Sequence, residues 1–203
     1  MSKLVNIIGA GGHTRSLISL IEHIGFEIQG IYDDTYDPRE SEIINGYPVL
    51  GKIDKIKEGT IVLSFGDCMK RYKMFGRFQG RILTDNLIHP TAYIDKYADL
   101  GSFNQVFAGA IVNSNTKIGS NNIINTGAII EHEVKVGNHN HISVGANVCG
   151  RVKIGSWCYI GAGSTIIDKL SVTDYVIIGA NTVVIRDITE AGTYVGNPAR
   201  RVK

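Results

Sequence analysis

A strict six-residue period of aliphatic side chains fills the second half of the chain and constrains its fold more than any other feature. Sixteen successive positions, six residues apart from Ile94 to Val184, are Ile, Leu or Val without a slip of register. A period of six fits neither a helix of 3.6 residues per turn nor an alternating strand. It is the signature of a hexapeptide β-helix, in which three hexads make one triangular coil of 18 residues.

The first part of the chain follows a different pattern. Short apolar runs alternate with a glycine turn and amphipathic segments, which predicts a βαβ unit of Rossmann type. The predicted strands are Lys3–Ile8, Phe26–Tyr32 and Ile61–Phe65, and the predicted helices cover about 14–24 and 69–78. Asn86 to Pro90 marks the junction, since Pro90 disfavours helix at the residue before it. We therefore expect an α/β domain over 1–85 and a β-helix with a C-terminal tail over 86–203.

Composition narrows the class of protein. The 203 residues include 21 basic and 19 acidic side chains, and no basic run is long enough for a nucleic-acid patch. The three cysteines show no CxxC spacing, which is typical of reduced thiols in a cytosolic protein. No apolar run reaches membrane-spanning length. These features predict a cytoplasmic protein without nucleic-acid partners or membrane insertion.

The glycine turn after the first strand is a candidate phosphate site. Gly9, Gly11 and Gly12 precede His13, although Thr14 stands where the dinucleotide fingerprint has its third glycine. A strand, a tight turn and a helix N-terminus together form an anion site, and a plain tight turn is the alternative. Asp33 and Asp34 end the second strand, where they could bind a ribose or a base or remain solvated turn residues.

Three of the six histidines lie within ten residues, in Glu131-His132-Glu133 and His139-Asn140-His141. Imidazole titrates near neutral pH, and a neighbouring carboxylate can fix its tautomer, so the cluster suits proton transfer. Two alternatives remain open from the residues alone: a surface cluster without a role, and a zinc site made by His132, His139 and His141. Because His132 and His141 are half a coil apart, they should project from different sides of the prism and could converge only between subunits.

Several segments resemble a known family. The run Asn125–Glu133, the closing Val195–Arg200 and the N-terminal glycine motif with the Asp33-Asp34 pair look like the bacterial nucleotide-amino-sugar acetyltransferases. The most similar type is the bacillosamine-pathway N-acetyltransferase, and the sialic acid O-acetyltransferases are its relatives. The resemblance covers nearly the whole chain and joins both domains.

The resemblance implies a left-handed β-helix, a homotrimer, and acetyl transfer from acetyl-CoA to the amine of a nucleotide-linked 4-amino-sugar without a metal. It implies that His132 is the general base and Glu133 the acid that supports it. The residues implied for acetyl-CoA are Asn125, His141 (from the neighbouring subunit), Ala162 and Ala180. Those implied for the nucleotide sugar are Gly11, Gly12, His13, Asp33, Asp34 and Gly66.

Two departures from the family pattern lie beside the expected nucleotide-sugar residues. The chain has Gly66-Asp67-Cys68 where Gly-Asn-Asn is frequent, and Thr14-Arg15 where small residues are commoner. The expected acceptor is a UDP-linked 4-amino-4,6-dideoxy sugar, with dTDP or GDP as other nucleotides. The rival functions are a sugar O-acetyltransferase, a zinc hydratase like the β-helical carbonic anhydrases, and a non-catalytic nucleotide-sugar-binding scaffold.

Overall fold

The structure, a computed structural model, describes residues 4–37 and 43–203. The chain divides into two compact units, Met1–Thr84 and Asp85–Lys203. Lys3, which the sequence assigns to the first strand, lies outside the described residues.

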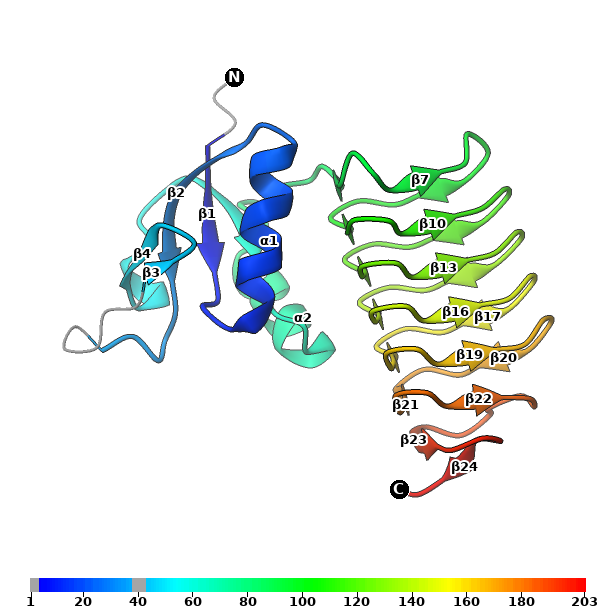
Figure 1. The fold of residues 1–203 in the computed structure, drawn as a ribbon. Coiled ribbons are helices and arrows are strands. Elements are labelled where there is room, and N and C mark those ends of the chain that lie inside the picture. Colours follow the sequence, from blue (N-terminus) through cyan, green and yellow to red (C-terminus); the bar gives the residue numbers. More distant parts are fainter. Residues whose placement is uncertain (1–3, 38–42) are drawn as a thin grey trace. The chain divides into compact units, whose positions relative to one another are not determined.

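Unit 1 is built on a five-stranded sheet with the order β3-β4-β2-β1-β5 (Figure 1). Its strands are β1 (Leu4–Ile8), β2 (Glu27–Tyr32), β3 (Ile43–Ile44), β4 (Tyr47–Gly51) and β5 (Thr60–Leu63). Its helices are α1 (Gly12–His23), the 3₁₀ turn η2 (Ile53–Lys55) and α2 (Cys68–Arg77). Strand β1 pairs in parallel with β2 and β5, and β2 with β4, as expected for a Rossmann-type unit.

The packing of unit 1 follows its apolar pattern. Helix α1 buries Leu17, Ile18 and Ile21 completely, and strand β1 buries Ile7 and Ile8. These side chains form the apolar face and the buried parallel strand that the sequence predicts. The helix is followed by Gly25, whose φ of +75° lies in the left-handed region where glycine is unstrained.

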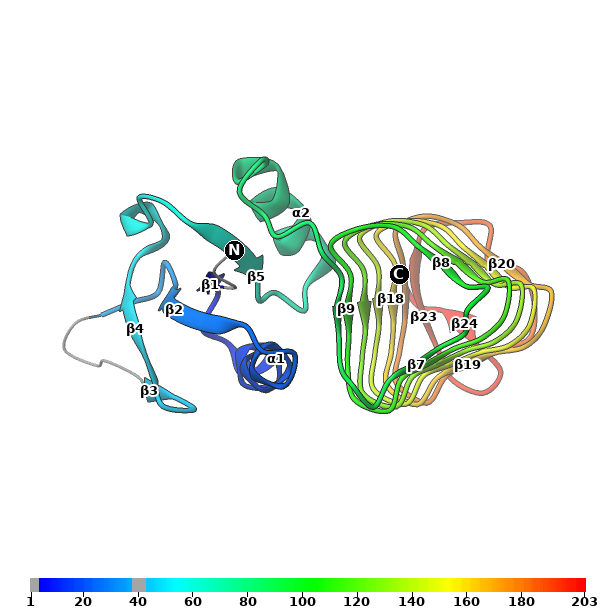
Figure 2. The same cartoon turned by 90° about the horizontal axis from the view of Figure 1, so that it is seen from above.

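Unit 2 is a parallel β-helix with three faces, seen down its long direction in Figure 2. The first face contains β6 (Leu87–Ile88), β9 (Gln105–Val106), β12 (Ile123–Ile124), β15 (His141–Ile142), β18 (Tyr159–Ile160), β21 (Val176–Ile178), β23 (Gly192–Val195) and β24 (Arg200–Arg201). The second face contains β7 (Tyr93–Ile94), β10 (Ile111–Val112), β13 (Ile129–Ile130), β16 (Asn147–Val148), β19 (Thr165–Ile166) and β22 (Val183–Val184). The third face contains β8 (Asp99–Leu100), β11 (Lys117–Ile118), β14 (Lys135–Val136), β17 (Lys153–Ile154) and β20 (Ser171–Val172).

The six-residue register sets the core. Strands on one face pair 18 residues apart, as Val112 with Ile130 and Ile130 with Val148. The aliphatic positions from Val106 to Val184 are buried in the prism, while Ile94 and Leu100 are partly buried against it. The register begins one hexad earlier than expected, because Ile88 also packs on this core and β6 pairs with β9. The segment we expected as a junction is therefore part of the first coil.

A ladder of asparagines stabilises the corner between the third and first faces from inside. Asn122 is fully buried, and its Nδ2 donates to the carbonyl of Gly137 at 3.1 Å. Its Oδ1 accepts the backbone N–H of Asn140, one coil later, at 2.8 Å. Asn104 and Asn140 repeat both contacts. The amides thus satisfy backbone groups that the turn would otherwise bury without partners.

Candidate functional site

A pocket of about 620 Å³ lies where strands β1, β2 and β5 of unit 1 end. All six residues expected to contact the nucleotide sugar line it: Gly11, Gly12, His13, Asp33, Asp34 and Gly66. The carboxyl ends of parallel strands beside a helix N-terminus are where doubly wound sheets bind ligands. Gly11 is the N-cap of α1 and brings no side chain to that end. The arrangement therefore suits an anionic group such as a phosphate.

The two acidic residues of the pocket hold its loops together. Asp33 Oδ2 accepts the N–H of Ala10 at 2.8 Å, and its Oδ1 accepts the N–H and hydroxyl of Thr35 at 2.8 and 2.6 Å. Burial alone would raise the pKa of Asp33, but the hydrogen bonds from Thr35 and Ala10 outweigh it and lower the pKa. Asp34 Oδ1 accepts the N–H of Ile53 at 3.2 Å. Both carboxylates thus connect neighbouring loops of the pocket.

The structure adds pocket residues that the sequence reasoning missed. Lys70, in the first turn of α2, and Met74, one turn later, also line the pocket. Arg71 is fully buried, and its Nη1 donates to the carbonyl of Phe65 at 2.8 Å, which fixes the loop after β5. The sequence does contain a signal for both basic residues, because Lys70 and Arg71 follow shortly after the Gly66-Asp67 turn.

The histidine–carboxylate pair in unit 2 lies at the corner between the second and third faces, after β13. His132 Nδ1 lies 3.1 Å from Glu133 Oε2. Hydrogen bonds from His132 and then from Arg151 lower the pKa of Glu133, so its carboxylate is ionised at neutral pH. An ionised carboxylate only accepts, so Nδ1 is the donor and the lone pair of neutral His132 is on Nε2. The two side chains are about half exposed, at 51% and 46%.

The His132 ring lies over the next coil. Gly150 is one coil after His132, and a Cβ added to it would be 2.7 Å from both Cε1 and Nε2 of the ring. Glycine at this position therefore leaves the space that the imidazole ring occupies. Arg151, which follows it, donates from Nε to Glu133 Oε2 at 2.9 Å. Neither contact was predicted, although stepping 18 residues from His132 and Glu133 would have found both.

The residues expected to contact the coenzyme gather elsewhere on the prism. Asn125 Oδ1 accepts the N–H of Thr126 at 2.8 Å, which directs its Nδ2 to His141 Nε2, 3.0 Å away. The His141 ring is 6% exposed and packs edge-on against Tyr159, with ring centroids 5.0 Å apart. Ala162 and Ala180 lie in successive turns of the same corner as Asn125, between the first and second faces.

Within one chain, His132 is thus at a different corner from Asn125, Ala162 and Ala180, and His141 is on the first face. This is the separation that the half-coil argument predicts. His139 is at the remaining corner, where its Nδ1 lies 2.9 Å from Asn121 Nδ2 and its ring stacks on Trp157. Among residues 4–37 and 43–203, no three His, Cys, Asp or Glu side chains gather as a metal-binding group.

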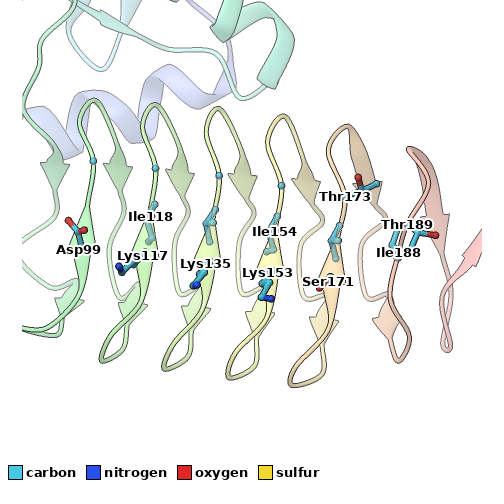
Figure 3. A pocket seen from close by; sticks show the side chains of 16 residues that line it. Asp99, Lys117, Ile118, Lys135, Lys153, Ile154, Ser171, Thr173, Ile188 and Thr189 are labelled. Carbon is cyan, nitrogen blue, oxygen red and sulfur yellow. The ribbon is translucent and has the colours of Figure 1, made fainter.

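An open groove of about 830 Å³ runs along the third face (Figure 3). Its lining includes a ladder of lysines in register, Lys117, Lys135 and Lys153. Gly119 and Gly137 also line the groove, and a Cβ at Gly119 would be 2.7 Å from the carbonyl oxygen of Gly137. The sequence reasoning assigned nothing to this groove.

No helix in the described part of the chain is long and apolar enough to cross a membrane.

Comparisons with known proteins cover both units of the chain. Residues 4–78 match the family model of the PglD N-terminal domain. None of the curated proteins matches the chain significantly. The chain thus has a PglD-type N-terminal domain, which agrees with the resemblance stated from its motifs.

Solved structures match over nearly the full length. PerB from Caulobacter crescentus, in complex with CoA and GDP-perosamine, is 29% identical with a TM-score of 0.88, over 98% of this chain and 97% of that one. A mutant GDP-perosamine N-acetyl transferase from the same organism, with the same ligands, is 26% identical with a TM-score of 0.88, over 98% and 96%. The acetyltransferase domain of PglB from Neisseria gonorrhoeae FA1090, with acetyl coenzyme A, is 28% identical with a TM-score of 0.87, over 100% of both chains.

These likenesses confirm the resemblance to nucleotide-amino-sugar acetyltransferases and the predicted fold, an α/β domain followed by a left-handed β-helix.

Proposed function

We propose that the chain is an acetyl-CoA-dependent N-acetyltransferase that acts on the amino group of a nucleotide-linked sugar, with His132 as general base. The observation that carries the proposal is the His132–Glu133 pair at 3.1 Å, in a chain that is similar over its full length to acetyltransferases with CoA or acetyl-CoA bound. The coenzyme is a co-substrate, and the proposed reaction involves no metal.

The acceptor is a nucleotide-linked 4-amino-4,6-dideoxy sugar. The two Caulobacter crescentus structures contain GDP-perosamine, so we place a GDP-linked sugar ahead of the UDP-linked sugar expected from the sequence, with dTDP third. We assign the nucleotide to the pocket of unit 1. The N-terminus of α1, at Gly11 and Gly12, faces the diphosphate, and Lys70 adds a positive charge. Asp33 and Asp34 line the same pocket, and Asp33 accepts the N–H of Ala10 beside that N-terminus.

The reaction needs one proton acceptor. The amine nitrogen attacks the thioester carbonyl carbon, and a tetrahedral oxyanion forms. Nε2 of His132 takes the proton that the amine loses, while Glu133 stabilises the charge through Nδ1. The oxyanion then collapses, the C–S bond breaks, and His132 returns the proton to the leaving CoA thiolate. The products are the amide and the free thiol of CoA.

The site needs more than one subunit. We assign the thioester end of acetyl-CoA to Asn125 and His141, and its chain to the turns at Ala162 and Ala180. Because these residues lie away from His132 in one chain, we place His132 of one subunit opposite them in the next, within a homotrimer. Backbone N–H groups, or His141, whose Nε2 lies 3.0 Å from Asn125 Nδ2, donate hydrogen bonds to the oxyanion.

The test is release of CoA thiol from acetyl-CoA with GDP-, UDP- and dTDP-linked 4-amino-sugars, with the matching 4-hydroxy sugars as controls. We expect turnover with an amino sugar only, and a product that gains one acetyl group stable to hydroxylamine. A hydroxylamine-labile product would assign the chain to O-acetyl transfer. Binding of the nucleotide sugar without thiol release would make it a non-catalytic scaffold.

A further inference from the structure

We propose that Arg151 is a positioning residue for the His132–Glu133 pair, which holds the Glu133 carboxylate in place and takes part of its charge. This inference rests on the proposed function and deepens it. It assigns a role to a side chain that neither the family resemblance nor the comparisons single out.

The first observation is that one oxygen serves both partners. Glu133 Oε2 accepts from Arg151 Nε at 2.9 Å and from His132 Nδ1 at 3.1 Å. A carboxylate that also neutralises a guanidinium stabilises an imidazolium less than one that faces the imidazole alone. Arg151 therefore takes part of the carboxylate charge that Glu133 would otherwise direct at His132 alone.

The second observation is that the 18-residue coil places Glu133 and Arg151 side by side in register. Glu133 and Arg151 occupy equivalent positions in successive coils, and the Arg151 N–H donates to the carbonyl of His132 at 3.0 Å. The His132 ring in turn lies over Gly150. The next coil thus contacts the pair at three points: the ring, the carboxylate and the backbone carbonyl.

The third observation is the backbone at Arg151. Its φ is +63°, in the left-handed region that disfavours side chains with a Cβ. The equivalent turns between the first and second faces have glycine there, at Gly127, Gly145 and Gly163. Glu133 and Lys169, at the same place in the coils before and after, also have positive φ, of +61° and +65°, so successive coils share this backbone conformation and it keeps Glu133 and Arg151 in register.

Other charged groups near the ring do not take this role. Glu131 Oε2 accepts the backbone N–H of His132 at 3.3 Å. One coil beyond Arg151, Lys169 pairs with Asp168 at 3.6 Å. Lys169 has a φ of +65° and the same place in its own coil, so it is a matched control for Arg151.

The experiment compares Arg151→Ala, Arg151→Lys and Lys169→Ala with the unchanged protein. NMR of ring-labelled histidine, assigned with His132→Gln, follows the pH at which the His132 ring takes up its proton. The acid limb of the kcat/KM profile gives the same quantity through catalysis. We expect Arg151→Ala to move the NMR midpoint of His132 and the acid limb of kcat/KM to higher pH. The expected shift is about 0.2–0.7 of a pH unit, the range for an exposed ion pair.

Arg151→Lys should recover part of the shift because it retains the charge, and Lys169→Ala should leave both quantities unchanged. The inference is overturned if Arg151→Ala does not raise the NMR midpoint, or if Lys169→Ala raises it equally. The NMR measurement does not require turnover, so the two proposals can fail separately. If the midpoint rises but the protein transfers no acetyl group, the Arg151 inference is supported and the proposed function is contradicted.

Discussion

Gly150 offers a way to move the His132 ring without touching the histidine itself. In Gly150→Ala, the new Cβ would lie 2.7 Å from Cε1 and Nε2 of the imidazole, and the three atoms nearest to it all belong to that ring. Carbon atoms in contact are about 3.5–4.0 Å apart, so the ring must retreat by about 1 Å. His132 is half exposed and has room to move outward, so the coil itself can stay in place.

The expected result is a loss of rate without a loss of fold. A displacement of about 1 Å in a catalytic group can cost about 10²-fold, so kcat for acetyl transfer should fall by about 10- to 100-fold. The φ of Gly150 is not in the left-handed region, so alanine should change the free energy of unfolding by less than about 1 kcal/mol. Thiol release measures the rate, and urea unfolding measures the stability.

The control is the same substitution in a His132→Ala background. If Gly150 acts through the imidazole, the double variant should be as slow as His132→Ala alone, because the two changes remove one function. Unchanged kcat in Gly150→Ala, or a further loss in the double variant, would refute the positioning of the ring by Gly150.

Three further predictions concern the parts of the chain around this site. Asn122→Ala should lower the free energy of unfolding by about 2–5 kcal/mol, because it leaves the Asn140 N–H and the Gly137 carbonyl buried without partners. Urea unfolding measures this loss, which should be much smaller for the control Asn147→Ala, because that change removes a single contact. Lys135→Gln should stabilise the β-helix by about 0.2–1 kcal/mol at low salt and less at high salt, since Lys135 lies between two like charges, and a destabilised variant would contradict this. Asp33→Asn should destabilise unit 1 at neutral pH. The folded-state pKa of Asp33 is lowered, so its contribution is present above the unfolded value of about 3.9 and is lost as pH falls from there through the folded-state pKa. A stability difference between the two proteins that does not shrink as pH falls below the unfolded value would count against this linkage.

The sequence predicts the β-helix well because its rule is local and repeated. Each aliphatic position tests the same register, and the buried side chains from Val106 to Val184 follow it without exception. The sequence places the first coil one hexad late, because Pro90 indicates a boundary although Ile88 is in phase with the repeat. The same step of 18 residues pairs Glu133 with Arg151, so the repeat also contains this contact at the corner.

The α/β unit shows where sequence reasoning ends. Strands β3 and β4 were not predicted, because β3 has two residues and no visible periodicity. Asn45 and Gly46 between them, both with positive φ, form the kind of turn that signals a hairpin. The contact of Asp33 with Ala10 depends on how two loops meet. The spacing of residues along the chain does not contain that information.

The most direct test of the account is the turnover of His132→Ala with a GDP-linked 4-amino-4,6-dideoxy sugar and saturating acetyl-CoA, beside the unchanged protein. Affinity for the nucleotide should stay the same, since we assign that ligand to unit 1. The account predicts that kcat falls at least about tenfold, toward the 10²–10⁴ range of general-base catalysis. Undiminished turnover in this variant would contradict it.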